Sequence, residues 1–230
     1  MWRVSVVCPS AWLVRPRSTR LRSEVALRYG RSVKTRTVLT PDDWADAALY
    51  SAAEVGLGAV RIEALARRLG VSKGSFYWHF TGLDELLRAA CVRWENAATD
   101  ETIIALEGIA EPRRRLEALL AVSVDRLDHL KVEAAIAAAA GRGDRHARPV
   151  YARVTRRRLE YVEGLYRELG STPAEARSWA WLTFGTYLGT VQLASLGFGS
   201  EKTLSTHVRF LTSQLVPAAG TKKTRSRGQR

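Results

Sequence analysis

Apolar residues recur at helical spacing along most of the chain after residue 40, and no stretch shows the two-residue alternation of a β-strand. The clearest example is residues 62–69, which place one apolar stripe on a short helix. Longer helices are predicted at residues 83–106, 112–131, 133–140, 146–169, 173–196 and 201–215. The sequence therefore predicts an all-α protein.

Two predicted helices begin with a capping box, in which a threonine and an acidic residue three positions later satisfy each other's backbone N–H groups. Thr40 and Asp43 form the first box, and Thr172 and Glu175 form the second, each with a proline at the first helical position. The second helix contains WAWLTFGTYLGTVQLASL, which is apolar on nearly every face. We expect neighbouring helices to cover it on all sides.

A helix, a tight turn and a short second helix are predicted within residues 61–80, RIEALARRLGVSKGSFYWHF. Gly70 supplies the positive φ at which the first helix stops, and Ser72 is placed to cap the second helix. In that helix Phe76 and Phe80 are one turn apart and face inward. This arrangement is typical of a helix-turn-helix unit that reads DNA.

The outer face of the second helix keeps hydrogen-bond donors, aromatic rings and one cation. These are Lys73, Ser75, Tyr77, Trp78 and His79. Gly74 inside so short a helix costs roughly 1 kcal/mol relative to alanine, which fits either a close approach to a DNA backbone or a frayed first turn. A protein contact patch is the alternative interpretation of this face.

The segment GVSKGSFYWHF, preceded by IEALARRL and WADAALYSAAEVG, resembles the TetR family of bacterial repressors over about residues 40 to 90. The resemblance implies a DNA-binding domain of three helices. It also implies contacts to phosphates and base edges from Ser72, Lys73, Gly74, Ser75, Tyr77, Trp78 and His79.

Two positions depart from the family's pattern. Arg61 stands where the family has a capping Thr or Ser, and Leu83 stands where the family has a Lys that contacts the DNA backbone. We keep Arg61 as a candidate phosphate contact, although a cation at a helix N-terminus opposes the helix dipole. Affinity for DNA is then expected to be lower, or to come from elsewhere in the chain.

Positive charge is concentrated at the two ends of the chain. Residues 1–40 hold nine Lys or Arg and one acidic residue, residues 217–230 hold five Lys or Arg, and together they account for the net charge of +13. We expect these ends to bind phosphates without reading sequence, with solvated tails as the alternative. Four parts are predicted: a basic disordered arm, 1–39; a DNA-binding domain, 40–86; an effector-binding and dimerisation domain, 87–216; and a basic tail, 217–230.

The first residues, WRVSVVCPSAWLV, have the apolar character of a secretory signal but lack its cleavage site, and a true start near Val25 or Val33 is favoured. No run reaches the roughly 18 apolar residues of a membrane span. Cys8 and Cys91 indicate neither a disulfide framework nor a zinc site. We expect a cytoplasmic protein without a metal or other cofactor.

The last two predicted helices are expected to form half of a four-helix bundle across a twofold axis, as in TetR-family dimers. Candidate interface residues are Gly185, Gly189, Leu204, Val208, Leu211 and Leu215. Core packing within one chain is the alternative. Two reading helices reach successive major grooves only when about 34 Å, or a multiple of it, separates them, so a homodimer predicts a pseudo-palindromic operator.

In the TetR family a small molecule enters the C-terminal domain, shifts the helix after the DNA-binding domain, and releases DNA; here that helix would be residues 83–106. Candidate ligand contacts are the rings of Trp94, Tyr151, Trp179, Phe184 and Tyr187, with ordinary core packing as the alternative. The spacing of Asp125 and His129 favours a surface hydrogen bond over a metal site.

No catalytic constellation can be assembled, because the four histidines are scattered and no phosphate-binding loop is present in the sequence. The chain is therefore predicted to be a ligand-responsive, sequence-specific transcriptional regulator, which in this family is most often a repressor. The alternative is an all-helical interaction or ligand-binding protein that retains the DNA-binding domain at residues 40–86, the reading head, but does not read DNA specifically.

Overall fold

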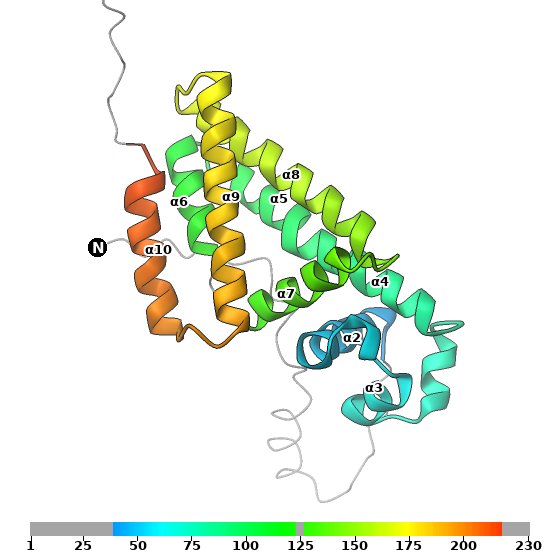
Figure 1. Ribbon diagram of the computed structural model, residues 1–230. Coiled ribbons are helices and arrows are strands. Elements are labelled where there is room, and N and C mark those ends of the chain that lie inside the picture. Colours follow the sequence, from blue (N-terminus) through cyan, green and yellow to red (C-terminus); the bar gives the residue numbers. More distant parts are fainter. Residues whose placement is uncertain (1–38, 123–126, 218–230) are drawn as a thin grey trace, which may run out of the picture. The chain divides into compact units, whose positions relative to one another are not determined.

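The computed structural model describes residues 39–122 and 127–217, and every regular element in these residues is a helix (Figure 1), which confirms the all-α prediction. The first elements are α2 (Pro41–Val55), η3 (Leu57–Ala59), α3 (Ile62–Leu69), η4 (Lys73–Trp78), α4 (Leu83–Glu95), η5 (Asn96–Asp100) and α5 (Glu101–Glu107). They are followed by α6 (Pro112–Val122), α7 (Leu127–Gly141), α8 (Ala147–Glu168), α9 (Pro173–Ser195) and α10 (Glu201–Leu215). None of the helices in the described ranges is long and apolar enough to cross a membrane.

Several sequence predictions fall outside the described residues. They are the basic arm up to residue 38, the possible starts at Val25 and Val33, Cys8, Asp125, and the tail from residue 218.

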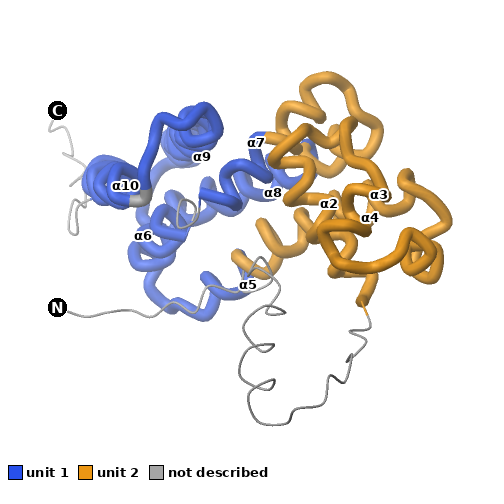
Figure 2. Tube along the Cα trace, turned by 90° about the horizontal axis from the view of Figure 1, so that it is seen from below, with its two compact units in different colours: residues 1–6, 103–134, 152–230 blue, residues 7–102, 135–151 orange. Residues whose placement is uncertain are grey.

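The chain divides into two compact units (Figure 2). Unit 2 contains α2 to η5, the end of α7 and the start of α8, whereas unit 1 contains α5, α6, the start of α7, most of α8, α9 and α10. Unit 2 therefore extends past residue 86, because α4 contributes Trp94, whose ring stacks on Tyr151 of α8 with centroids 5.9 Å apart. The boundary at residue 86 between the DNA-binding domain and the effector-binding domain stays a prediction.

Both predicted capping boxes are present. At α2 the Asp43 N–H donates to the Thr40 hydroxyl oxygen (3.3 Å) and the Thr40 N–H donates to the Asp43 carboxylate (2.7 Å). At α9 the Glu175 N–H donates to the Thr172 hydroxyl oxygen (3.4 Å) and the Thr172 N–H donates to the Glu175 carboxylate (3.0 Å). Each box satisfies two N–H groups that the helix itself leaves without partners.

One predicted helix break is wrong, and one irregularity was not foreseen. Helix α7 runs without interruption from Leu127 to Gly141, so there is no break between residues 131 and 133. Leu130 and Ala134, one turn apart across that point, pack against the same apolar cluster, which explains the continuity. The predicted helix at 83–106 contains the π-helical segment η5, whose wider turn buries Ala97 and Thr99.

Unit 2 is built around aromatic side chains and one arginine. Trp44 of α2 meets Phe76 of η4 edge to face, with ring centroids 5.3 Å apart, and both side chains are fully buried. Arg93 of α4 donates to the carboxylates of Asp42 (2.7 Å) and Asp46 (2.9 Å) of α2. These contacts hold α2, η4 and α4 together as one domain.

One core of unit 1 joins α6, α8, α9 and α10. Its centre is Tyr166, which has no exposed surface and stacks on Trp179 with centroids 5.8 Å apart. The Tyr166 hydroxyl donates to the Leu215 carbonyl (2.8 Å) and hydrogen-bonds the Thr183 hydroxyl (2.8 Å). Burial raises the pKa of this phenol. Tyr166 thus links three helices through polar groups inside an apolar core.

We expect Tyr166→Phe to lower the free energy of unfolding by about 1–3 kcal/mol, because it leaves the buried Thr183 hydroxyl and Leu215 carbonyl without this partner. Urea denaturation followed by circular dichroism measures the change. Tyr77→Phe, at a tyrosine that is 55% exposed, is the matched control and should leave the stability within about 0.5 kcal/mol of wild type. Equal stability of all three proteins would contradict the assigned role of Tyr166.

Candidate nucleic-acid interface

The turn after α3 has the geometry expected from Gly70. Its φ is 70°, in the left-handed region, and the following Val71 N–H donates back to the Ala66 carbonyl (3.0 Å). This pair of features terminates α3 as a glycine C-cap does. A Cβ at Gly70 would have no atom within 4 Å, so glycine is favoured there by its backbone conformation and not by lack of space.

The second helix of the unit, η4, is a 3₁₀-helix. The predicted side-chain cap by Ser72 is wrong: its hydroxyl makes no capping hydrogen bond, and its carbonyl instead accepts the Ser75 N–H (3.0 Å). That tighter closure belongs to the 3₁₀ geometry. Phe76 and Phe80 are buried and stacked with centroids 5.6 Å apart, which confirms that they face inward.

The opposite side of η4 exposes aromatic rings. Trp78 is 85% exposed and Tyr77 is 55% exposed. Ser72, Lys73 and Gly74 are also exposed, whereas Ser75 and His79 are half-buried. A large indole left in water on a short, well-anchored element is typical of a contact surface.

Cations near this surface are engaged within the domain. Lys73 donates to Glu63 (2.6 Å), and Arg68 pairs with Glu54 (2.8 Å). Arg61 donates to the carbonyls of Gly58 (3.0 Å) and Val60 (2.8 Å), and α3 has no side-chain cap, as expected for arginine at this position. The predicted phosphate contact of Arg61 would require these bonds to be shared or broken.

The reading head has few basic side chains, so their pairing within the domain affects how it can bind DNA phosphates. Residues 41–86 contain seven acidic and four basic side chains, and three of the four basic ones are those just described. The hydrogen bond with Glu63 raises the pKa of Lys73, and Lys73 lowers the pKa of Glu63. A DNA phosphate must therefore compete with Glu63 for the Lys73 ammonium group.

The start of α4 is fixed by contacts that local sequence patterns do not indicate. Glu85 accepts the Thr81 N–H and hydroxyl, each at 2.7 Å, which anchors the turn after η4. Asp84, next to Leu83, pairs with His146 (2.9 Å) and Arg145 of the α7–α8 turn. His146 lies 62 residues further along the chain, and no local pattern relates two positions so far apart.

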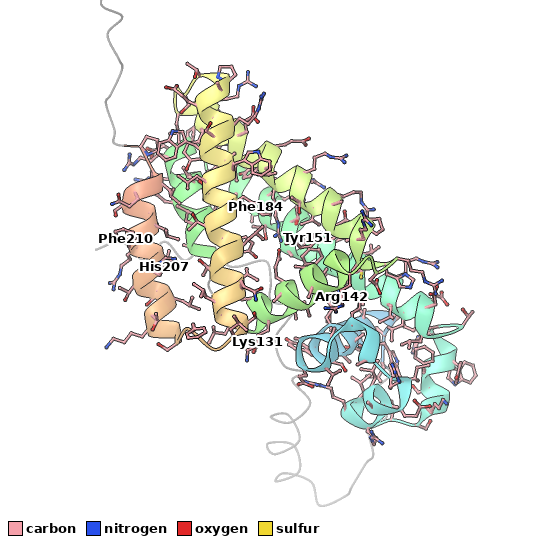
Figure 3. The ribbon with its side chains drawn as sticks, in the orientation of Figure 1. Lys131, Arg142, Tyr151, Phe184, His207 and Phe210 are labelled. Carbon is pink, nitrogen blue, oxygen red and sulfur yellow. The ribbon has the colours of Figure 1, made fainter. Side chains whose placement is uncertain are left out.

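The five rings predicted to contact a ligand are distributed over both units. Trp94 and Tyr151 stack on each other in unit 2 and Trp94 is 2% exposed, whereas Trp179, Phe184 and Tyr187 lie on α9 in unit 1. Phe184 and Tyr187 are neighbours with centroids 6.0 Å apart, and Trp179 stacks on Tyr166 instead. Figure 3 labels Tyr151 on α8 and Phe184 on α9.

The predicted dimer residues also separate into two sets. Gly185 and Gly189 lie on the exposed side of α9, and a Cβ at either would have no atom within 4 Å. Leu204 and Leu215 of α10 are only 6% and 5% exposed, because they pack into the apolar clusters of their own unit. The prediction that Leu204 and Leu215 lie in a dimer interface is therefore wrong. Val208 and Leu211 are half-buried.

The exposed apolar surface of these two helices comes from other residues. Trp181, Leu182 and Leu193 of α9, and Leu196 directly after it, each expose more than half of their area. Phe210 of α10, labelled in Figure 3, is 60% exposed. Helix α9 is therefore not covered on all sides by its own chain.

The arrangement of α3, the turn at Gly70 and η4 is that of a helix-turn-helix unit. The model of bacterial regulatory proteins of the tetR family matches residues 45–90. The match includes the whole of α3 and η4 and confirms the resemblance found in the sequence.

Solved structures with a similar fold include transcriptional regulators. One from Rhodococcus sp. Rha1 is 23% identical, with a TM-score of 0.61 over 77% of this chain and 96% of that chain. Another, from Saccharomonospora viridis in complex with choline, is 20% identical, with a TM-score of 0.64 over 75% of this chain and 95% of that chain. A TetR-family regulator from Mesorhizobium loti is 21% identical, with a TM-score of 0.54 over 79% and 97%. No curated protein sequence matches the chain.

We expect Glu63→Gln to strengthen binding to duplex DNA of arbitrary sequence, because Lys73 is freed for a phosphate. The slope of log K against log salt should steepen by about 0.9, the value for one additional phosphate contact. Glu54→Gln removes the same charge and frees Arg68, but leaves the pair at η4 intact, so it is the matched control. Fluorescence anisotropy over a salt series measures both variants, and equal slopes for them would refute a particular role for Glu63.

Proposed function

We propose that this protein is a ligand-responsive transcriptional repressor that binds a pseudo-palindromic operator as a homodimer and is released by a small-molecule effector. The observation that carries the proposal is the pair of exposed rings, Tyr77 and Trp78, on an element held from behind by buried Phe76 and located inside the family match. Ser72, Lys73, Gly74, Ser75 and His79 complete the proposed DNA surface, with Arg61 beside it.

The exposed side of α9 and α10 supports the homodimer. Three large apolar side chains of α9, Leu196 directly after it and Phe210 of α10 are more than half exposed, while two glycines on α9 would allow a partner helix to approach closely. Two copies joined through this face would present two reading elements, as a palindromic site requires. Trp181, Leu182 and Phe210 thus take the place of the two buried leucines in the proposed interface.

The choline complex of the Saccharomonospora viridis regulator supports a small-molecule effector in this fold. For release, the effector must bind the DNA-incompetent conformation more tightly than the competent one. We propose that residues 83–106 carry the change, because α4 is bonded both to α2 through Arg93 and to the α7–α8 turn through Asp84. The Asp84 contacts link this helix directly to residues that are distant from the reading head in the sequence.

One observation favours a second candidate function. The head carries more acidic than basic residues, and its lysine is already paired with Glu63. An all-helical interaction protein that retains the head without reading DNA would have the same features. Direct selection of DNA separates the two candidates.

Purified protein should enrich a palindromic sequence from fragments of the source genome at near-physiological salt. Trp78→Ala should lower the affinity for that sequence by about tenfold or more, the loss of one good base contact, with unchanged helix content and oligomeric state. Ile104→Ala, at an exposed apolar side chain of α5 that is 67% exposed, is the control and should bind as wild type. Sequence-blind, salt-sensitive capture by all three proteins would favour the second candidate.

A further inference from the structure

Unit 1 contains a buried ion pair between α7 and α8. Arg158 holds both oxygens of the Glu133 carboxylate, at 2.8 Å through Nη1 and 3.2 Å through Nη2. The Glu133 side chain is 3% exposed and that of Arg158 is 14% exposed. Such a two-point contact is the strongest geometry available to these groups.

A third helix adds an aromatic ring to the pair. The guanidinium carbon of Arg158 lies 5.6 Å from the ring centroid of Tyr187 on α9, within the range of a cation–π interaction. Tyr187 itself packs against the apolar cluster formed by α7, α9 and α10 and lies beside Phe184. A carboxylate and a ring, held by two helices, therefore surround one cation that belongs to the protein.

The stability of the unit does not explain why this pair is present. Taking both charges out of water offsets most of their attraction, and apolar residues of similar size often serve as well or better. A buried carboxylate beside an aromatic face is, by contrast, the chemistry that recognises organic cations. Glu133 is the more deeply buried and shorter of the two charged side chains, whereas Arg158 has a long flexible stem and more contact with solvent.

We propose that Glu133 and Tyr187 form a cation-binding subsite, that Arg158 occupies it in the free protein, and that an organic ammonium ligand displaces Arg158 on binding. The inference rests on the proposed effector response and names the chemical class of the effector. The exchange replaces one cation by another, so the Glu133 carboxylate stays neutralised throughout. An anionic ligand at Arg158 would instead meet the Glu133 carboxylate, and like charges would repel.

The displacement of Arg158 determines how tightly the ammonium ligand binds. If Arg158 occupies the subsite most of the time, the apparent dissociation constant of the ligand is raised by the inverse of the vacant fraction. Weakening the internal competitor should therefore tighten binding, whereas weakening the carboxylate or the ring should abolish it. An ordinary structural ion pair would show neither effect.

The test is calorimetric titration of the full-length protein with tetramethylammonium chloride, with tert-butanol as an uncharged probe and sodium acetate as an anionic one. Arg158→Met should bind tetramethylammonium at least about tenfold more tightly than wild type. Glu133→Gln and Tyr187→Leu should lose binding, and Tyr187→Phe, which keeps the ring, should retain it. Arg156→Met, at an exposed neighbour on the same helix, should bind as wild type.

Arg158→Lys covers the case in which Arg158→Met does not fold, because lysine keeps the charge but loses the two-point contact; it should bind more tightly than wild type. Failure of tetramethylammonium to bind wild type and either Arg158 variant, or binding of acetate in its place, would overturn the proposal. Operator binding is measured in parallel. Specific DNA binding without cation binding refutes the subsite alone, and cation binding that leaves the DNA complex unchanged refutes effector release alone.

Discussion

The edge-to-face contact between Trp44 and Phe76 is the interaction on which the reading head depends. It buries one side of η4 against α2, and a 3₁₀-helix turns by about a third of a revolution per residue. Once Phe76 points inward, the next two residues lie on other faces of the element. The exposure of Tyr77 and Trp78 therefore accompanies burial of Phe76, whose ring also meets that of Tyr77 edge to face, with centroids 5.2 Å apart.

The helix that follows the head is bonded on two sides within unit 2. Arg93 joins α4 to α2, and Asp84 joins its first turn to the α7–α8 turn. A change in α4 therefore has to keep or exchange these charged contacts, which are discrete and directional. This is the kind of element that can adopt two distinct arrangements and respond to a ligand by a shift in their populations.

Local chemistry made much of the fold and part of the site predictable. The stop at Gly70, the two capping boxes and the inward Phe76 each depend on residues within a few positions, and the sequence contains all of them. The pairs Lys73 with Glu63, Asp84 with His146, and Arg158 with Glu133 join different elements, which periodicity does not relate. Periodicity also cannot tell whether a stripe such as Leu204 and Leu215 is covered by its own chain or by another.

The acidic head suggests how specificity and affinity could be divided in this protein. Glu63 competes with phosphate for Lys73 at every DNA sequence, so it weakens all complexes alike. A site that also contacts the exposed rings through its bases gains binding energy that other sequences lack. Selectivity depends on the difference between the affinity for the operator and the affinity for other DNA. A smaller phosphate contribution to both affinities reduces the fraction of protein bound to non-specific DNA. Glu63 therefore acts as a repulsive element next to the side chains proposed to read the operator.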